Sequence, residues 1–272
     1  MSTPSDDSAL SLWTIGSIAI VAYCFANVLH EGLGHGGACL LMGGRPQTLN
    51  AIFFAYDMST VSPAGNRFIA AGGPIVNLIN GGIALLLLRF WKPWADSARY
   101  FLWLFSAVNI LMAFGYVLFS GVAGVGDWMG VLGGLASPIS VRLGLALIGA
   151  FLYFIVAPWL LMPGFMNFLN HDCAAGPQIR RMARFPYVIG GTTFLLAGLL
   201  NPYGLKLVLI SAVAASFGGT SLLGWYPMTG KDPSSSKTLG NPLVLKTSRG
   251  WMIAAALTLV VFVGFFGRGM NF

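Results

Sequence analysis

The chain has 272 residues, of which 56% are hydrophobic and only 8% are charged, and its mean hydropathy is +0.77. These values exclude a water-soluble globular domain. The formal net charge of +7 comes mostly from lysines and arginines in short segments between apolar runs, which is an orientation signal of membrane proteins and not the footprint of a nucleic-acid binder. The composition therefore predicts a multi-pass integral membrane protein that contacts the lipid bilayer and no nucleic acid.

Seven apolar stretches are candidates for membrane-spanning helices, each of which needs about 20 mostly apolar residues. In chain order they are residues 10–29, 68–88, 100–119, 141–161, 187–200, 205–223 and 251–266. We therefore expect an all-α polytopic membrane protein with about six or seven transmembrane helices. Residues 10–272 would form a single transmembrane domain after a polar N-terminal tail, residues 1–9. Residues 128–136 could add a half-span, which leaves the count open.

The segment after the first span has a different pattern. Residues 48–56 are rich in β-forming types and are bounded by glycines at 43–44 and by Ser-Pro-Ala-Gly at 62–65. This pattern predicts a short hairpin or a re-entrant segment. Non-helical backbone at membrane depth is tolerated only against protein or a water-filled cavity. The segment therefore also indicates a cavity beside the first span.

The only glutamate in the chain, Glu31, lies between two of the three histidines, His30 and His35. The sequence His-Glu-Gly-Leu-Gly-His is one residue longer than the H-E-x-x-H helix motif of zinc peptidases. Histidines five residues apart diverge by about 140° on a regular α-helix and cannot meet at one metal ion. A π-type bulge restores a common face, and Gly32 and Gly34 make such a distortion less costly. The spacing therefore predicts a bulged helix.

These residue types fit a metal centre. Two neutral imidazoles and a third protein ligand can hold Zn²⁺ with one position left for water, and a neighbouring carboxylate can act as base. Ionisable residues inside a membrane are costly, so a functional role is their default interpretation. Asp127, in an apolar and glycine-rich stretch, is the preferred third ligand, and His171 is its rival. A regular helix would instead place Glu31, His35 and Cys39 on one face, which leaves no base.

Three segments together resemble the site-2 protease family of intramembrane zinc metallopeptidases. They are the His-Glu…His motif on an early span, Gly-Pro-Ile-Val-Asn at 73–77, and Gly-Asp at 126–127, and the resemblance covers about residues 21–134. It implies that His30, His35 and Asp127 bind zinc and that Glu31 is the catalytic base. The chain departs from the family in three motif features: the extra residue in the zinc motif, Trp128 after the aspartate, and a missing Asn-x-x-Pro lead-in. It also has no room for the PDZ domain of many bacterial members.

The resemblance also implies roles for the segment at 73–77. Asn77 would help to hold the substrate strand or the developing oxyanion. Gly73 and Pro74 would break or kink their helix and let a substrate backbone approach. The extra residue in the zinc motif is similar to the H-E-x-x-x-H motif of the dipeptidyl peptidase III family.

We therefore expect a zinc-dependent intramembrane endopeptidase of the bacterial cytoplasmic membrane. It would hydrolyse a peptide bond in or near the transmembrane segment of a membrane protein. Two other classes stay open. One is a catalytically inactive relative that binds membrane proteins, and the other is a metal or proton transporter, because intramembrane histidine and aspartate also mark ion pathways.

Overall fold

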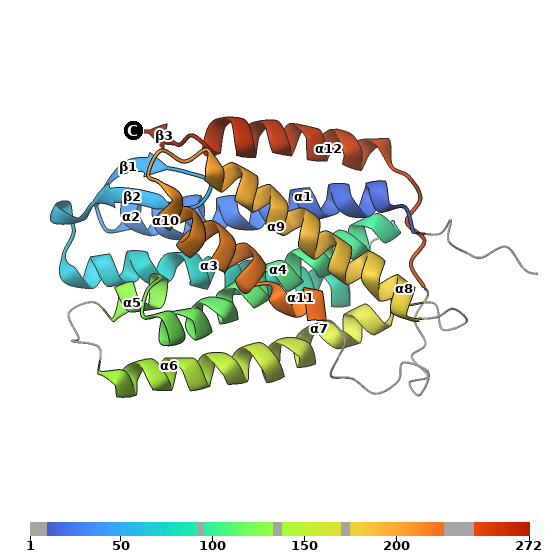
Figure 1. Cartoon of the computed structure of the whole chain (residues 1–272), viewed down its shortest axis with the longest axis horizontal. Coiled ribbons are helices and arrows are strands. Elements are labelled where there is room, and N and C mark those ends of the chain that lie inside the picture. Colours follow the sequence, from blue (N-terminus) through green and yellow to red (C-terminus); the bar gives the residue numbers. More distant parts are fainter. Residues whose placement is uncertain (1–9, 92–94, 133–137, 170–174, 226–241) are drawn as a thin grey trace, which may run out of the picture.

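The structure is a computed structural model that describes residues 10–91, 95–132, 138–169, 175–225 and 242–272. Most helices run side by side along the longest axis, and a small sheet lies at one end (Figure 1). Five helices in the described residues are long and apolar enough to cross a membrane: Leu12–Leu41, Pro63–Phe90, Asp96–Ala123, Ile139–Met166 and Arg249–Phe266. The predicted all-α polytopic membrane fold is confirmed.

The first spanning helix is continuous but changes its winding near its end. It consists of three segments: α1 (Leu12–Val28), the π-helical η1 (Leu29–Gly36) and α2 (Gly37–Leu41). The Ser11 hydroxyl caps α1 by accepting a hydrogen bond from the backbone N–H of Thr14. The C-terminal half of this helix therefore contains a π-helical segment that carries the histidine motif.

The second and third spans are α3 (Pro63–Phe90) and α4 (Asp96–Ala123), each of 28 residues. Ser62 caps α3, and Pro63 occupies its first turn, where its missing N–H costs no helical hydrogen bond. Most residues of α4 are buried, so α4 is the central helix of the bundle. After α4 the glycines Gly124 and Gly126 adopt φ of 70° and 94°, and this sharp turn leads into the short helix α5 (Asp127–Val131).

The remaining two long helices lie at the outside of the bundle. One runs through α6 (Ile139–Phe151), η3 (Leu152–Val156) and α7 (Ala157–Met166), and the other through α12 (Arg249–Leu259) and η7 (Val260–Phe266). Figure 1 shows them on opposite sides of the bundle. Large apolar side chains such as Leu147 and Trp159 are exposed on the first of them, as expected for a surface that faces lipid.

Two predicted spans form shorter helices. The predicted span 187–200 corresponds to α9 (Phe185–Leu199), which follows α8 (Ala175–Ile179) and η4 (Arg180–Arg184). The predicted span 205–223 is divided among α10 (Leu205–Leu207), η5 (Val208–Gly218) and α11 (Ser221–Trp225). Neither is among the five long apolar helices. α9 packs against α1 and η5, so both segments are still part of the bundle.

The predicted hairpin is present after the first span. Strands β1 (Arg45–Leu49) and β2 (Phe54–Asp57) pair antiparallel, and the short 3-10 helix η2 (Met58–Thr60) leads from them to α3. A third strand, β3 (Met270–Asn271), pairs antiparallel with β1, so the order in the sheet is β2-β1-β3. The hairpin is thus held on one side by residues from far along the chain.

The backbones of η1 and α3 are in close contact. A Cβ built on Gly72 would lie 2.3 Å from the carbonyl oxygen of Gly34, and one built on Gly34 would lie 2.6 Å from the Cα of Gly73. Any side chain at these positions would force the two backbones apart. Small residues allow such an approach inside lipid, where no hydrophobic force drives helices together.

Replacing Gly72 with alanine should therefore destabilise the protein by about 1–3 kcal/mol, the usual range for an overpacked contact. The matched control is Gly82→Ala on the same helix, where an added Cβ meets nothing within 4 Å. Thermal unfolding in detergent measures both. A Gly72→Ala midpoint equal to that of Gly82→Ala would contradict the close contact.

Candidate metal centre

The π-helical segment η1 brings the two histidines of the motif together. The ring centroids of His30 and His35 lie 4.9 Å apart, with an angle of 85° between the ring planes. The His30 side chain is 1% exposed and His35 is 9% exposed. The bulge predicted from the five-residue spacing is confirmed, because η1 covers Leu29–Gly36 and includes the whole motif.

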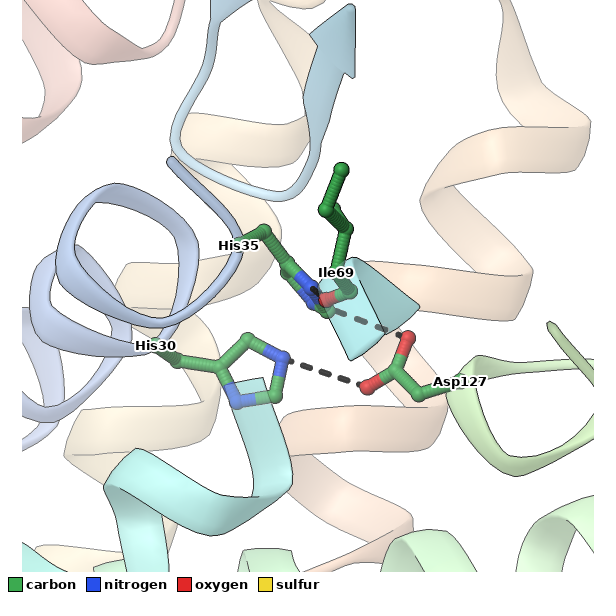
Figure 2. Close-up of polar contacts among 4 residues, drawn as sticks. All are labelled: His30, His35, Ile69 and Asp127. Carbon is green, nitrogen blue, oxygen red and sulfur yellow. Dashed lines mark hydrogen bonds and ion pairs between the residues drawn. The ribbon is translucent and has the colours of Figure 1, made fainter. Parts of the chain in front are cut away.

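Asp127 approaches both histidines from a different element. The turn at Gly124 and Gly126 places it at the start of α5, with its two carboxylate oxygens directed at the two rings (Figure 2). His30 Nε2 lies 3.3 Å from Asp127 Oδ2, and His35 Nε2 lies 3.7 Å from Asp127 Oδ1. Donor atoms around a tetrahedral zinc ion with bonds of about 2.0–2.1 Å lie roughly 3.3–3.4 Å apart. The two separations are close to this value, so the group could hold a metal ion.

The three side chains form the one group in the described residues whose geometry could hold a metal ion. Their donor atoms all lie within 4.8 Å of one another. His35 is oriented by its second ring nitrogen, since Nδ1 lies 2.7 Å from the backbone oxygen of Ile69 and is placed to donate to it (Figure 2). That hydrogen bond leaves the lone pair of Nε2 free to bind a metal. Two imidazoles and one carboxylate, with a position left open, are a donor set of catalytic zinc sites.

Asp127 lies outside the five long helices, and its charge state suits a metal ligand. Burial acts to raise the pKa of its carboxyl group, but the neighbouring rings of His35 and His30 outweigh this effect and hold the pKa below its usual value. Asp127 is therefore ionised at neutral pH.

A cavity of about 220 Å³ adjoins the metal centre on the side of His35 and Asp127. Glu31, His35 and Asp127 line it, while Glu31 is not part of the converging donor group. Most of the other lining residues are apolar or aromatic and come from the hairpin, α3 and α4: Ile52, Phe53, Phe54, Tyr56, Ile69, Ala70, Tyr116 and Phe119. The arrangement thus combines three candidate ligands, one further carboxyl group and space for another molecule.

The alternative ligand sets have different outcomes. Cys39 is fully buried in a small apolar cluster with Ala38, Val61 and Ile69, and the described structure does not group it with Glu31 and His35. The rival third ligand His171 lies outside the described residues.

The predicted substrate residues on α3 are placed in three ways. Gly73 touches the metal centre, because a Cβ on it would lie 2.5 Å from His30 Nε2 and 2.6 Å from His35 Nε2. Pro74 does not break the helix, since α3 continues through it. It cannot donate a hydrogen bond to the carbonyl of Ala70, one turn earlier, and Ala70 lines the cavity. Asn77 is completely buried and is not part of the cavity wall.

The sequence does not single out the aromatic wall of the site. Tyr116, from α4, stacks on His30 with 5.0 Å between ring centroids and 15° between ring planes. Phe54 and Tyr56, from β2, stack on each other at 6.0 Å. The hairpin predicted from the sequence contains Phe54 and Tyr56 and indicates a cavity beside them. Nothing in the local sequence distinguishes Tyr116 from the other aromatic residues of α4.

Fold and site together define a polytopic helical membrane protein with a His-His-Asp group that could hold a metal ion. Comparison of the chain with protein-family models, with curated proteins and with solved structures gives no match.

Purified protein should bind one zinc ion per chain, and His35→Ala or Asp127→Ala should weaken binding by more than about 100-fold, beyond the effect of losing an outer-shell partner. Chelator competition in detergent measures the affinity. Asp57→Ala is the control, because that carboxylate accepts hydrogen bonds from Ser59 in an exposed turn. If Asp127→Ala bound zinc with wild-type affinity, Asp127 would not be a ligand, and His171→Ala would be the next variant to measure.

Proposed function

We propose that this protein is a zinc-dependent intramembrane endopeptidase, related to the site-2 proteases, that hydrolyses a peptide bond in or near a transmembrane segment of another membrane protein. The observation that carries the proposal is the convergence of His30, His35 and Asp127 beside a cavity that Glu31 also lines. A catalytic metal site needs a free ligand position next to space for substrate. A closed shell of four protein ligands would offer neither.

Each side chain has a distinct task in this proposal. His30, His35 and Asp127 hold the ion, which when bound lowers the pKa of water and polarises a carbonyl group. Glu31 takes a proton from the attacking water as the new C–O bond forms at the peptide carbonyl. It then gives that proton to the leaving amine nitrogen as the C–N bond breaks, so it serves as base and then as acid.

The position of the site supports a membrane-embedded substrate. The histidine motif lies on the long apolar helix Leu12–Leu41, where a segment within the bilayer can reach it, and most of the residues that line the cavity are apolar or aromatic.

The competing classes differ in what they need from the same residues. A transporter needs a pathway with alternating access, often built from two repeats, and the sequence contains no internal repeat. An inactive relative has no use for a carboxyl group beside the metal, yet the only glutamate of the chain lies at this cavity.

Glu31→Gln keeps the size of the side chain but removes the proton acceptor, so it should lower kcat by about 10²–10⁴-fold. The assay uses protein in liposomes with a panel of dye-labelled single-span peptides, and fragments are identified by mass spectrometry. Zinc content is measured on the same samples and should be unchanged, because Glu31 is not a ligand in this proposal.

Asp57→Asn is the matched control for loss of a carboxylate outside the site. Cleavage by Glu31→Gln at the wild-type rate would refute the role of Glu31. Zinc flux into liposomes that depends on His30, without any cleavage, would favour the transporter.

A further inference from the structure

Two buried side chains, one in the metal centre and one on the adjoining helix α3, carry polar atoms that have no hydrogen-bond partner in the described structure. These atoms are Nδ1 of His30 and both the oxygen and the nitrogen of the Asn77 side-chain amide. His30 is 1% exposed and Asn77 is 0% exposed. An unpaired buried polar group costs roughly 1–3 kcal/mol, so two of them in one region need an explanation.

The helix contact places these two groups in the same region. Gly73 lies against His30, since a Cβ on it would be 2.5 Å from both Cε1 and Nε2 of the ring. Asn77 follows Gly73 by one turn of α3 and shares its face. A helical side chain leans toward the N-terminus of its helix, so the Asn77 amide extends over the turn of Gly73. Asn77 therefore lies on the face of α3 whose residue Gly73 contacts the His30 ring.

The two groups are also chemically complementary. If His30 binds a metal through Nε2, its ring is neutral and its proton is on Nδ1, which must then find an acceptor. His35 has one in the backbone oxygen of Ile69. His30 has none among the described residues. The side-chain oxygen of Asn77 is an acceptor without a donor.

We propose that Asn77 is a positioning residue for the metal ligand His30: its side-chain oxygen accepts the hydrogen bond of the Nδ1–H group through one buried water molecule. The water is part of the proposal because no direct hydrogen bond joins the two side chains. This assignment replaces the role of Asn77 at the substrate, which its complete burial and its absence from the cavity wall disfavour. It rests on the metal centre of the proposed function.

The test measures zinc affinity and not cleavage. Asn77→Leu removes the acceptor and should weaken zinc binding by about 10–100-fold, the usual effect of losing such a partner of a metal-bound histidine. Asn77→Asp keeps an oxygen acceptor and should bind zinc at least as tightly as the wild type. Asn80→Leu is the matched control, because Asn80 also has an unpaired buried amide nitrogen on α3 but lies almost one turn further from Gly73.

A second measurement separates positioning from a structural role. Replacing an unpaired buried amide with an apolar side chain of similar size should leave the thermal stability of the metal-free protein unchanged or raise it. Asn77→Leu should thus lose zinc affinity without losing metal-free stability. If Asn77→Leu lowers the stability of the metal-free protein, zinc affinity is compared between Asn77→Asp and Asn77→Ala instead.

The outcomes are distinct. Zinc affinity of Asn77→Leu equal to the wild type, an equal loss in Asn80→Leu, or a failure of Asn77→Asp to restore binding would each overturn the role of Asn77 while leaving the proposed enzyme intact. Absence of zinc binding by the wild-type protein would instead overturn the metal centre and, with it, both proposals.

Discussion

The contact between η1 and α3 at Gly34 and Gly72 is the constraint on which the rest of the site depends. Side chains are absent on both sides, so the two backbones touch and α3 lies directly under the histidine rings. That proximity lets the backbone of Ile69 orient His35 and lets Gly73 fit against both imidazoles. Inside a lipid bilayer, such an approach depends on close packing, because apolar side chains gain no hydrophobic free energy by moving from lipid to protein.

Much of the fold and the centre of the site could be predicted because their signals are local. Apolar length indicates spanning helices, and the five-residue spacing of His30 and His35 admits convergence only through a bulge. Asp127 stands out because acids are rare in apolar surroundings. The shorter helices could not be recognised in the same way. Hydropathy measures composition, but it does not show where a helix is interrupted.

Other features of the site depend on tertiary contacts that have no sequence pattern of their own. Tyr116 stacks on His30 only because α4 passes the end of η1, and many aromatic residues of this chain would look equivalent. Proline at position 74 predicts a break in the helix, because it lacks a backbone N–H group, yet α3 remains continuous through it. The burial of Asn77 away from the cavity wall could not be derived from its motif, because the motif does not show which residues of α3 face the cavity.

The pairing of β3 with β1 determines when the site can be completed during synthesis. The Thr48 hydroxyl in β1 donates a hydrogen bond to the side-chain oxygen of Asn271 in β3, 223 positions further along the sequence. At the hairpin tip, the carbonyl groups of Phe266 and Gly267 accept hydrogen bonds from Ala51 and Asn50. The histidine helix and its hairpin are synthesised long before these partners leave the ribosome. The wall of the cavity therefore closes at a late step of biogenesis, and a nascent chain that already carries all the candidate ligands lacks the finished chamber.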